Sequence, residues 1–220
     1  MNIKLSSNAP ILIDIANDKT VTLKLSGTNK VWAEDAHAGI EKNGDNRGSL
    51  IITNENNGIL KAFGKNGAGI GGGNNQIGSN ITISGGDVQA ISDWAGAGIG
   101  GGDGNGSYIT ISGRKVKISS NNRAIGTGSG NTITPSNSNA VNVWQDTYDE
   151  NAAKAYSNYT STLDISSWTN KKLMIIFNKI NVDSSNSSSG SSSSYHASCS
   201  HHYECEVERT NRNAGRRACI

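Results

Sequence analysis

Three short segments recur along the chain in a fixed order, and each has its own pattern of apolar and polar positions. The first contains an Ala-Gly-Ile motif or a degenerate copy of it, and its isoleucines are Ile40, Ile70, Ile99 and Ile125. The copies follow one another at intervals of 30, 29 and 26 residues. Self-similarity at such a period is typical of a stacked-repeat architecture, in which each repeat forms one turn of a solenoid.

The second and third segments mostly alternate apolar with polar residues, which is the period-two signature of a half-buried β-strand. The second segment comprises residues 23–25, 50–52, 81–83 and 109–111. The third segment comprises residues 31–33, 60–62, 88–90, 116–118 and 141–143. Turns rich in Gly, Ser and Asn separate the segments, and no stretch between them has helical period or length.

This pattern predicts an all-β fold: a right-handed parallel β-helix (solenoid) of about four to five coils, with three short strands per coil, within residues 1–145. Parallel stacking places each inward side chain over its counterpart in the next coil, at about 4.8 Å per rung. The predicted inward columns are Ile40, Ile70 and Ile99, and Leu50, Ile81 and Ile109. An antiparallel sandwich is the competing fold, but it does not require the same residue at the same phase of every period.

The repeat pattern ends after Trp144. Residues 146–182 are predicted to cap the solenoid, because the apolar run LMIIF at 173–177 could form a final strand over its open end. Residues 183–195 are predicted to be a flexible linker, since this stretch is mostly serine. Residues 196–220 form a separate Cys/His-containing tail, which we interpret as truncated.

The GAGIGGG motifs resemble the glycine-rich turns that bind nucleotides, but the segments that follow them do not fit that function. A dinucleotide-binding turn opens a helix, whose N-terminus meets the pyrophosphate. Here each copy leads to a polar loop and another strand. We therefore interpret Gly39, Gly69 and Gly98 as an outward column where the coil needs no side chain.

Composition and charge narrow the function classes. Apolar residues make up 34% of the 220 residues and 27 are Gly, which suits coils with few inward side chains and many tight turns. The formal net charge is only +2, and the Arg-rich run at 209–217 is interpreted as a solvated tail rather than a nucleic-acid-binding patch. We therefore predict no nucleic-acid partner. We also predict no membrane span, because no window of 18 or more apolar residues exists.

Some polysaccharide lyases and hydrolases also have a parallel β-helix fold, so a catalytic function has to be considered. Glycoside cleavage needs two carboxyl groups about 5–10 Å apart on one face. No two of the carboxylates near the turns share a phase in neighbouring coils, and we predict that the chain is not an enzyme. The candidates considered are Asp35, Glu41, Asp45, Asp87, Asp93 and Asp103.

A solenoid presents rows of outward side chains, which suit an extended glycan. The predicted outward row of the third segment is Trp32, Lys61, Gln89, Lys117 and Asn142. Trp94 and Tyr108 are expected in nearby turns, so the predicted carbohydrate-binding residues are Trp32, Lys61, Gln89, Trp94, Tyr108 and Lys117. The alternative is that the aromatic residues only cover the corners of the coils. An ice-binding surface is disfavoured, because the sequence predicts only two adjacent threonines, Thr82 and Thr110, on the outer face of the second segment.

Two segments contain metal-ligating residue types. In the tail, Cys199, His201 and Cys219 could hold Zn²⁺, with Cys205 or His202 as the further ligand of a tetrahedral site. A free tail is the alternative, and a disulfide would leave one of the three cysteines unpaired. In the repeat, Asp103 and Asn105 could ligate Ca²⁺, although a solvated turn is the simpler interpretation.

The phrases GAGIGGG, ITISGG and Val-x-Ala resemble the glycine-rich repeats of secreted and cell-surface proteins of clostridia and related gut bacteria, a carbohydrate-binding β-helix family. The resemblance covers about residues 20–145; the copies at 40–45 and 114–116 depart from it. The tail CSHHYE resembles the Cys-x-His-x-Tyr-x-Trp start of a small repeat, but Cys205 replaces the expected Trp. The resemblance implies an extracellular role that faces polysaccharide.

Together these observations predict a non-catalytic, polysaccharide-binding module that is secreted or attached to the cell surface. The first residues lack a signal-peptide-like apolar stretch, and both ends resemble cuts through a longer multidomain chain. A structural stalk or adhesin repeat is the first alternative function. A polysaccharide lyase or glycoside hydrolase is the second.

Overall fold

The computed structural model describes residues 1–44, 48–135, 139–151 and 155–179, which lie within one compact unit, Met1–Asn181. These residues form an all-β solenoid of about four turns with parallel stacked strands, which confirms the predicted fold class. The described residues contain no helix, and hence none that could cross a membrane. The predicted linker (183–195) and Cys/His tail (196–220) lie outside the described residues.

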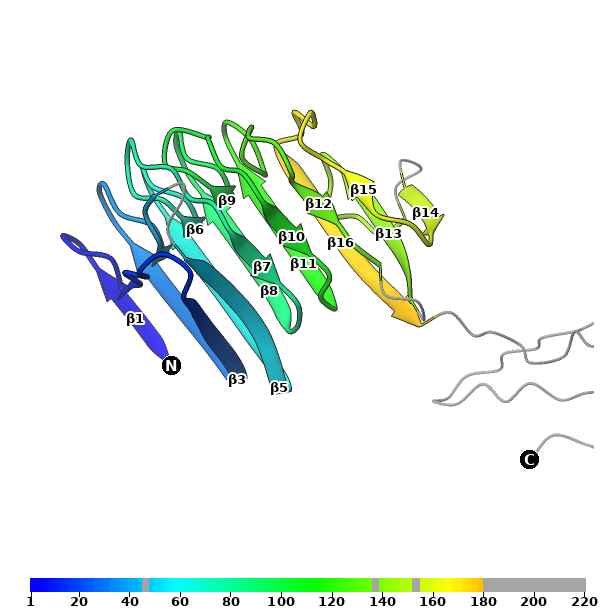
Figure 1. Cartoon of the computed structure of the whole chain (residues 1–220), viewed down its shortest axis with the longest axis horizontal. Coiled ribbons are helices and arrows are strands. Elements are labelled where there is room, and N and C mark those ends of the chain that lie inside the picture. Colours follow the sequence, from blue (N-terminus) through cyan, green and yellow to red (C-terminus); the bar gives the residue numbers. More distant parts are fainter. Residues whose placement is uncertain (45–47, 136–138, 152–154, 180–220) are drawn as a thin grey trace, which may run out of the picture. The chain divides into compact units, whose positions relative to one another are not determined.

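Each coil offers three strand positions, as the sequence predicts (Figure 1). At the first position lie β2 (Ile11–Leu12), β4 (Ile40–Glu41), β6 (Ile70–Gly71) and β9 (Ile99–Gly100). At the second position lie β7 (Ile81–Ile83), β10 (Ile109–Ile111) and β12 (Thr132–Ile133). At the third position lie β1 (Asn2–Leu5), β8 (Asp87–Ser92) and β11 (Lys115–Ser120). Two long strands run through both the second and the third position: β3 (Thr20–Ala33) and β5 (Ser49–Gly64).

The predicted inward columns are in register. At the first position each isoleucine pairs with the next, and an isolated bridge extends the column to Ile125. At the second position Leu50 pairs with Ile81, which pairs with Ile109. These three side chains are fully buried, and burial of such a side chain contributes about 1.5–3 kcal/mol to folding. The column of matching apolar residues is therefore the core of the solenoid.

The C-terminal part of the stack differs from the prediction. Residues 141–143 do not lie directly over 116–118, because another strand is inserted between them. This strand is β16 (Lys172–Lys179), which pairs antiparallel with β11 on one side and with β13 (Asn139–Gln145) on the other. Two further antiparallel strands complete the sheet: β14 (Ala155–Tyr159), which pairs with β13, and β15 (Leu163–Asp164), which pairs with β12.

The inserted strand explains the densest apolar run of the chain. Leu173 and Ile175 lie opposite the inward residues of β11, whereas Met174 lies on the outer side, opposite Trp144. All four side chains are buried. A strand that is covered on both faces needs consecutive apolar residues rather than alternation, so LMIIF belongs inside the sheet and not over its open end.

The prediction that Gly39, Gly69 and Gly98 face outward is wrong. All three are buried against the neighbouring coils. A Cβ atom on Gly39 would lie 2.7 Å from the backbone nitrogen of Phe63, and one on Gly69 would lie 2.5 Å from that of Ile91. These glycines allow the first position to pack against the backbone of the third-position strands, where no side chain fits.

The first testable prediction concerns this close approach. Gly69→Ala should lower the free energy of unfolding by about 3 kcal/mol or more, because the new methyl group meets backbone that cannot move aside without breaking the strand register. Chemical denaturation followed by circular dichroism measures this loss.

Gly27→Ala is the matched control. Gly27 has a φ of +59° but nothing within 4 Å of its Cβ position, so the same substitution should cost only the left-handed backbone penalty of about 1–2 kcal/mol. If Gly69→Ala proves no more destabilising than Gly27→Ala, the proposed close packing of the first position is incorrect.

Candidate functional site

The outward side chains of β3, β5, β8 and β11 include two adjacent rows, which we call together the third-strand face. A third outward row, Ile59, Asp87 and Lys115, lies between them and the corner with the second position. The first row is Lys30, Lys61, Gln89 and Lys117, and the second is Trp32, Phe63, Ile91 and Ser119. Side chains within a row are about 4.8 Å apart from one coil to the next. The structure therefore brings three of the predicted binding residues, Lys61, Gln89 and Lys117, into one row.

Trp32 does not belong to that row, contrary to the prediction. At the start of β3, Thr20 pairs with Ser49, but the numerical offset between paired residues has grown by two where Lys30 pairs with Lys61. The coil that contains β5 thus has two extra residues at the corner between the second and third positions. Because the extra residues shift the pairing, Lys61 lies beside Lys30, and Trp32 lies beside Phe63.

The other end of the row also differs. Asn142 pairs with Ile176 of the inserted strand, and the residue that follows Lys117 in the row is Met174. The predicted row of five side chains is therefore interrupted by β16. Asn142 is no part of the third-strand face.

Trp32 and Phe63 form a stacked pair at the N-terminal end of the face. Their ring centroids are 3.8 Å apart and the ring planes are inclined by 22°. The Lys4 ammonium lies 5.6 Å from the centroid of the Trp32 ring, and Lys4 is itself paired with Glu34. Because Trp32 remains 42% exposed, the pair offers an accessible aromatic surface next to the lysine row.

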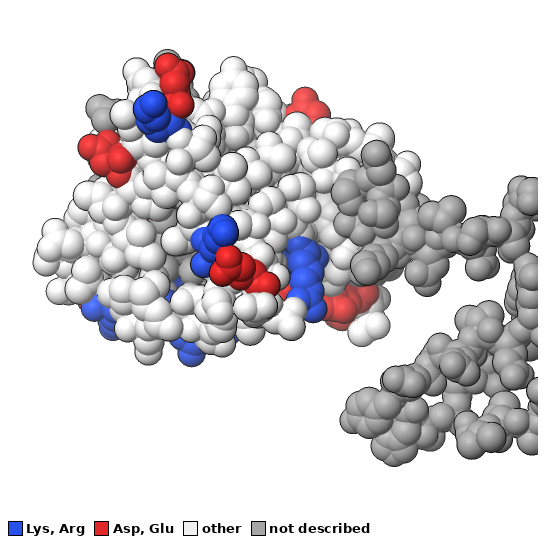
Figure 2. All heavy atoms as spheres, turned by 60° about the horizontal axis from the view of Figure 1, so that its bottom comes forward, with Lys and Arg blue, Asp and Glu red and all other residues white. Residues whose placement is uncertain are grey.

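The charges along the first row are unevenly compensated. Lys30 and Lys61 are exposed, and within the described ranges neither has an ion-pair partner. Lys117 lies 5.4 Å from the centroid of the Tyr148 ring, and the adjacent Lys115 binds Glu150 at 2.8 Å, which lowers the pKa of the Glu150 carboxyl. In Figure 2 most of the visible charged side chains lie beside one of the opposite sign. The open, cationic part of the face is therefore its N-terminal half.

The two remaining predicted binding residues lie elsewhere. Trp94 is 66% exposed and follows β8, at the edge of the third-strand face. Tyr108 is 56% exposed and immediately precedes β10, at the corner between the first and second positions. The structure therefore separates Tyr108 from the third-strand face, whereas Trp94 lies in the turn that follows one of its strands.

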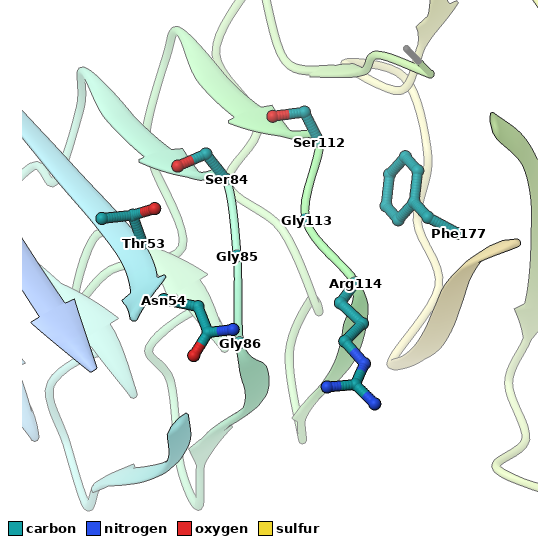
Figure 3. Close-up of a pocket in the computed structure, with 9 residues that line it drawn as sticks. All are labelled: Thr53, Asn54, Ser84, Gly85, Gly86, Ser112, Gly113, Arg114 and Phe177. Atoms are coloured by element: carbon teal, nitrogen blue, oxygen red, sulfur yellow. The ribbon is translucent and has the colours of Figure 1, made fainter. Parts of the chain in front are cut away.

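Sequence reasoning missed a hollow at the corner between the second and third positions. This corner hollow has a volume of about 450 Å³. It is shown in Figure 3, where Ser84 and Ser112 lie on neighbouring coils and Phe177 forms one wall. The lining consists of Thr53, Asn54, Ser84, Gly85, Gly86, Ser112, Gly113, Arg114 and Phe177.

A change in coil length produces the hollow. Ile52 pairs with Ile83, but Leu60 pairs with Val88, where an unchanged offset would have reached Ile91. The coil that contains β7 and β8 therefore has three fewer residues at this corner. Its short Ser-Gly-Gly turn leaves the corner recessed behind the long β5, and β16 closes the far side with Phe177. The turns at 84–86 and 112–114 were visible in the sequence, but the recess depends on their register with β5.

The candidate Ca²⁺ ligands are already engaged with each other. The Asp103 carboxylate accepts hydrogen bonds from the backbone N–H of Asn105 at 3.0 Å and from its side-chain amide at 2.9 Å. The side-chain oxygen Oδ1 of Asn105 in turn accepts a hydrogen bond from the Thr127 hydroxyl at 2.8 Å. Within the described ranges, no three His, Cys, Asp or Glu side chains are grouped as metal ligands. The candidate Zn²⁺ ligands Cys199, His201 and Cys219 lie outside those ranges.

Among the candidate carboxylates, Glu41 has a structural environment that the sequence did not indicate. Its side chain is buried and accepts hydrogen bonds from the backbone N–H of Ala38 at 3.1 Å and from the Asn43 amide at 2.8 Å. The ring nitrogen Nδ1 of His37 lies 2.8 Å from the same carboxylate. Glu41 stands where the next coil has Gly71, and its carboxylate binds the turn that other copies make with glycine.

Comparisons with protein-family models, with curated proteins and with solved structures find no match to this chain.

The environment of Glu41 gives the second testable prediction. Glu41→Ala should lower the free energy of unfolding by about 1–3 kcal/mol, because it leaves buried donors unpaired. Glu55→Ala is the control: Glu55 is exposed and paired only with Lys24, so its loss should cost less than about 1 kcal/mol. Thermal or urea denaturation of the two variants compares them, and equal stabilities would contradict the structural role of Glu41.

Proposed function

We propose that the third-strand face binds an extended carbohydrate chain without cleaving it. The observation that carries this proposal is the register of two adjacent rows, one of amine and amide donors and the other headed by an exposed aromatic pair. Aromatic faces pack against the apolar C–H surface of a sugar ring, while lysine and glutamine side chains donate hydrogen bonds to hydroxyl or carboxylate oxygens. Both kinds of contact are available side by side along the coils.

The length of the face suits a polymer. Four rungs from Lys30 to Lys117 span about 14 Å at the spacing of paired strands. A glycan that lies along the solenoid axis would meet one side chain of each row at every coil. Because the two rows contain an amide and aromatic rings as well as lysines, the face suits either a neutral or an acidic polysaccharide. Lys30 and Lys61 favour an acidic one.

The non-catalytic part of the proposal is supported by the environments of the carboxylates. Glu41 is buried within its turn, and Asp103 is bound to Asn105. Asp87 lies beside Arg114, with 4.0 Å between the nearest charged atoms. Hydrolysis needs two carboxyl groups that face a shared substrate, whereas Glu41 and Asp103 are engaged within their own turns. The proposal also places the protein outside the cell, as a module of a larger surface protein.

Binding can be tested with the variants Trp32→Ala and Lys30→Gln/Lys61→Gln. We expect the protein to be retarded in gels that contain at least one neutral or acidic polysaccharide. Each variant should then bind at least tenfold more weakly, a loss of about 1.4 kcal/mol, because it removes the stacking surface or the free cations. Isothermal titration with oligosaccharides of the same glycan quantifies the effect.

Lys19→Gln/Lys65→Gln is the matched control, since both lysines are exposed and neither belongs to the third-strand face. Undiminished binding by the Trp32 and Lys30/Lys61 variants would show that this face is not the site. A folded protein that binds no glycan would favour the structural stalk. Release of reducing ends or unsaturated uronides would favour the lyase or hydrolase.

A further inference from the structure

The corner hollow is a second surface with binding chemistry, and it differs in kind from the third-strand face. It is recessed instead of flat, and its volume of about 450 Å³ falls within the range of roughly 300–1,000 Å³ that is typical of small-molecule sites. A space of this size suits a single sugar residue, or a short branch, better than a polymer that lies along the coils.

The hydroxyl groups of the hollow are arranged in register. Thr53, Ser84 and Ser112 each directly follow one of three residues that pair with one another from coil to coil, Ile52, Ile83 and Ile111. Their hydroxyls therefore repeat at about 4.8 Å along the stack. Each can donate and accept a hydrogen bond, although Ser84 also reaches the carbonyl oxygen of Ile52 at 3.3 Å. Such a row matches a ligand with several hydroxyl groups.

Arg114 is the charged residue of the lining. Its Nη1 donates a hydrogen bond to the Asn57 side chain at 2.6 Å, and its Nε lies 4.0 Å from the nearest Asp87 oxygen, beyond hydrogen-bond distance. A guanidinium has five N–H donors, so several remain for a ligand. Its planar fork matches the two oxygens of a carboxylate or a similar oxyanion.

Phe177 adds an apolar wall opposite the hydroxyls (Figure 3). The backbone N–H of Phe177 donates to the carbonyl oxygen of Arg114 at 3.0 Å, so the inserted strand holds the backbone of Phe177 beside that of Arg114. Between these side chains the lining is glycine backbone. A Cβ on Gly113 would lie 2.6 Å from the backbone nitrogen of Gly85, so position 113 requires glycine and contributes no side chain to the recess.

We propose that the corner hollow binds one anionic residue of a glycan, a sugar that carries a carboxylate or a sulfate. Arg114 holds the anion, the Ser84 and Ser112 hydroxyls contact the ring hydroxyls, and Phe177 packs against the ring. This inference rests on the proposed function, and it makes acidic rather than neutral polysaccharide the ligand class.

The test uses short probes of two or three sugar residues. Trigalacturonate represents a carboxylated sugar, a heparin disaccharide represents a sulfated one, and maltotriose is the neutral reference. Binding is measured by titration calorimetry with the full chain and with the variants Arg114→Gln, Ser84→Leu and Lys65→Gln. Ser84 is exposed, so leucine at this position can fill the hollow without altering the core.

At least one anionic probe should bind at least tenfold more tightly than maltotriose. Arg114→Gln and Ser84→Leu should each weaken that binding tenfold or more, and Lys65→Gln should change it less than twofold. Which anionic probe binds distinguishes carboxylate from sulfate recognition. The inference is overturned if neither anionic probe binds, if maltotriose binds as tightly, or if both hollow variants bind normally. Melting temperatures confirm that each variant is folded.

The same variants separate this inference from the proposed function. If Lys30→Gln/Lys61→Gln abolishes binding of a polysaccharide while Arg114→Gln and Ser84→Leu still bind it, the third-strand face is a binding site and the hollow is not. If binding of the short anionic probe requires Arg114 while the Lys30/Lys61 variant keeps full affinity for the polymer, the hollow is a binding site and the third-strand face is not.

Discussion

Parallel backbone hydrogen bonds between successive coils hold each residue beside one particular residue of the next coil, and everything else in this protein follows from that register. The buried isoleucine and leucine columns stabilise it from the inside, because a slip of one residue would turn every apolar side chain of a strand outward. Gly39 and Gly69 permit it at the first position, where the backbone of neighbouring strands leaves no space for a side chain. The rows of outward side chains, and hence any surface that could bind a periodic ligand, are a consequence of the same pairing.

Small changes in coil length give an otherwise uniform solenoid its distinctive features. Two extra residues in the coil of β5 move Lys30 beside Lys61 and stack Trp32 on Phe63. The three residues missing from the following corner create the hollow between Thr53 and Phe177. The two candidate binding surfaces thus both depend on changes in coil length at one corner, between the second and third positions. An antiparallel strand, β16, then ends the parallel register and supplies the hollow with its aromatic wall.

The fold could be predicted from the sequence because the columns at the first and second positions repeat with little variation. One further copy was overlooked: Ile11 pairs with Ile40, its counterpart in the next coil, although only its apolar character marked it. The strand β12 was also missed, since Asn131 takes the inward place that Ile109 holds one coil earlier. Its side chain is fully buried and bonded to backbone carbonyl groups. The rows of the candidate site were predicted only in part. Counting residues cannot tell at which corner an extra residue is placed, and the inserted β16 lies far beyond β11 in the chain.

The register can be measured directly by disulfide trapping, in a protein whose own three cysteines are replaced by serine. The structure places Lys30 opposite Lys61 in adjacent strands, at a Cα separation of about 4.8 Å, which a disulfide can bridge. Trp32 and Lys61 are two residues out of register, about 8 Å apart by strand geometry, and lie beyond the reach of a disulfide. The account predicts rapid, complete oxidation of a Lys30→Cys/Lys61→Cys pair and none of a Trp32→Cys/Lys61→Cys pair. The reverse result would contradict the register, and with it both rows of the third-strand face.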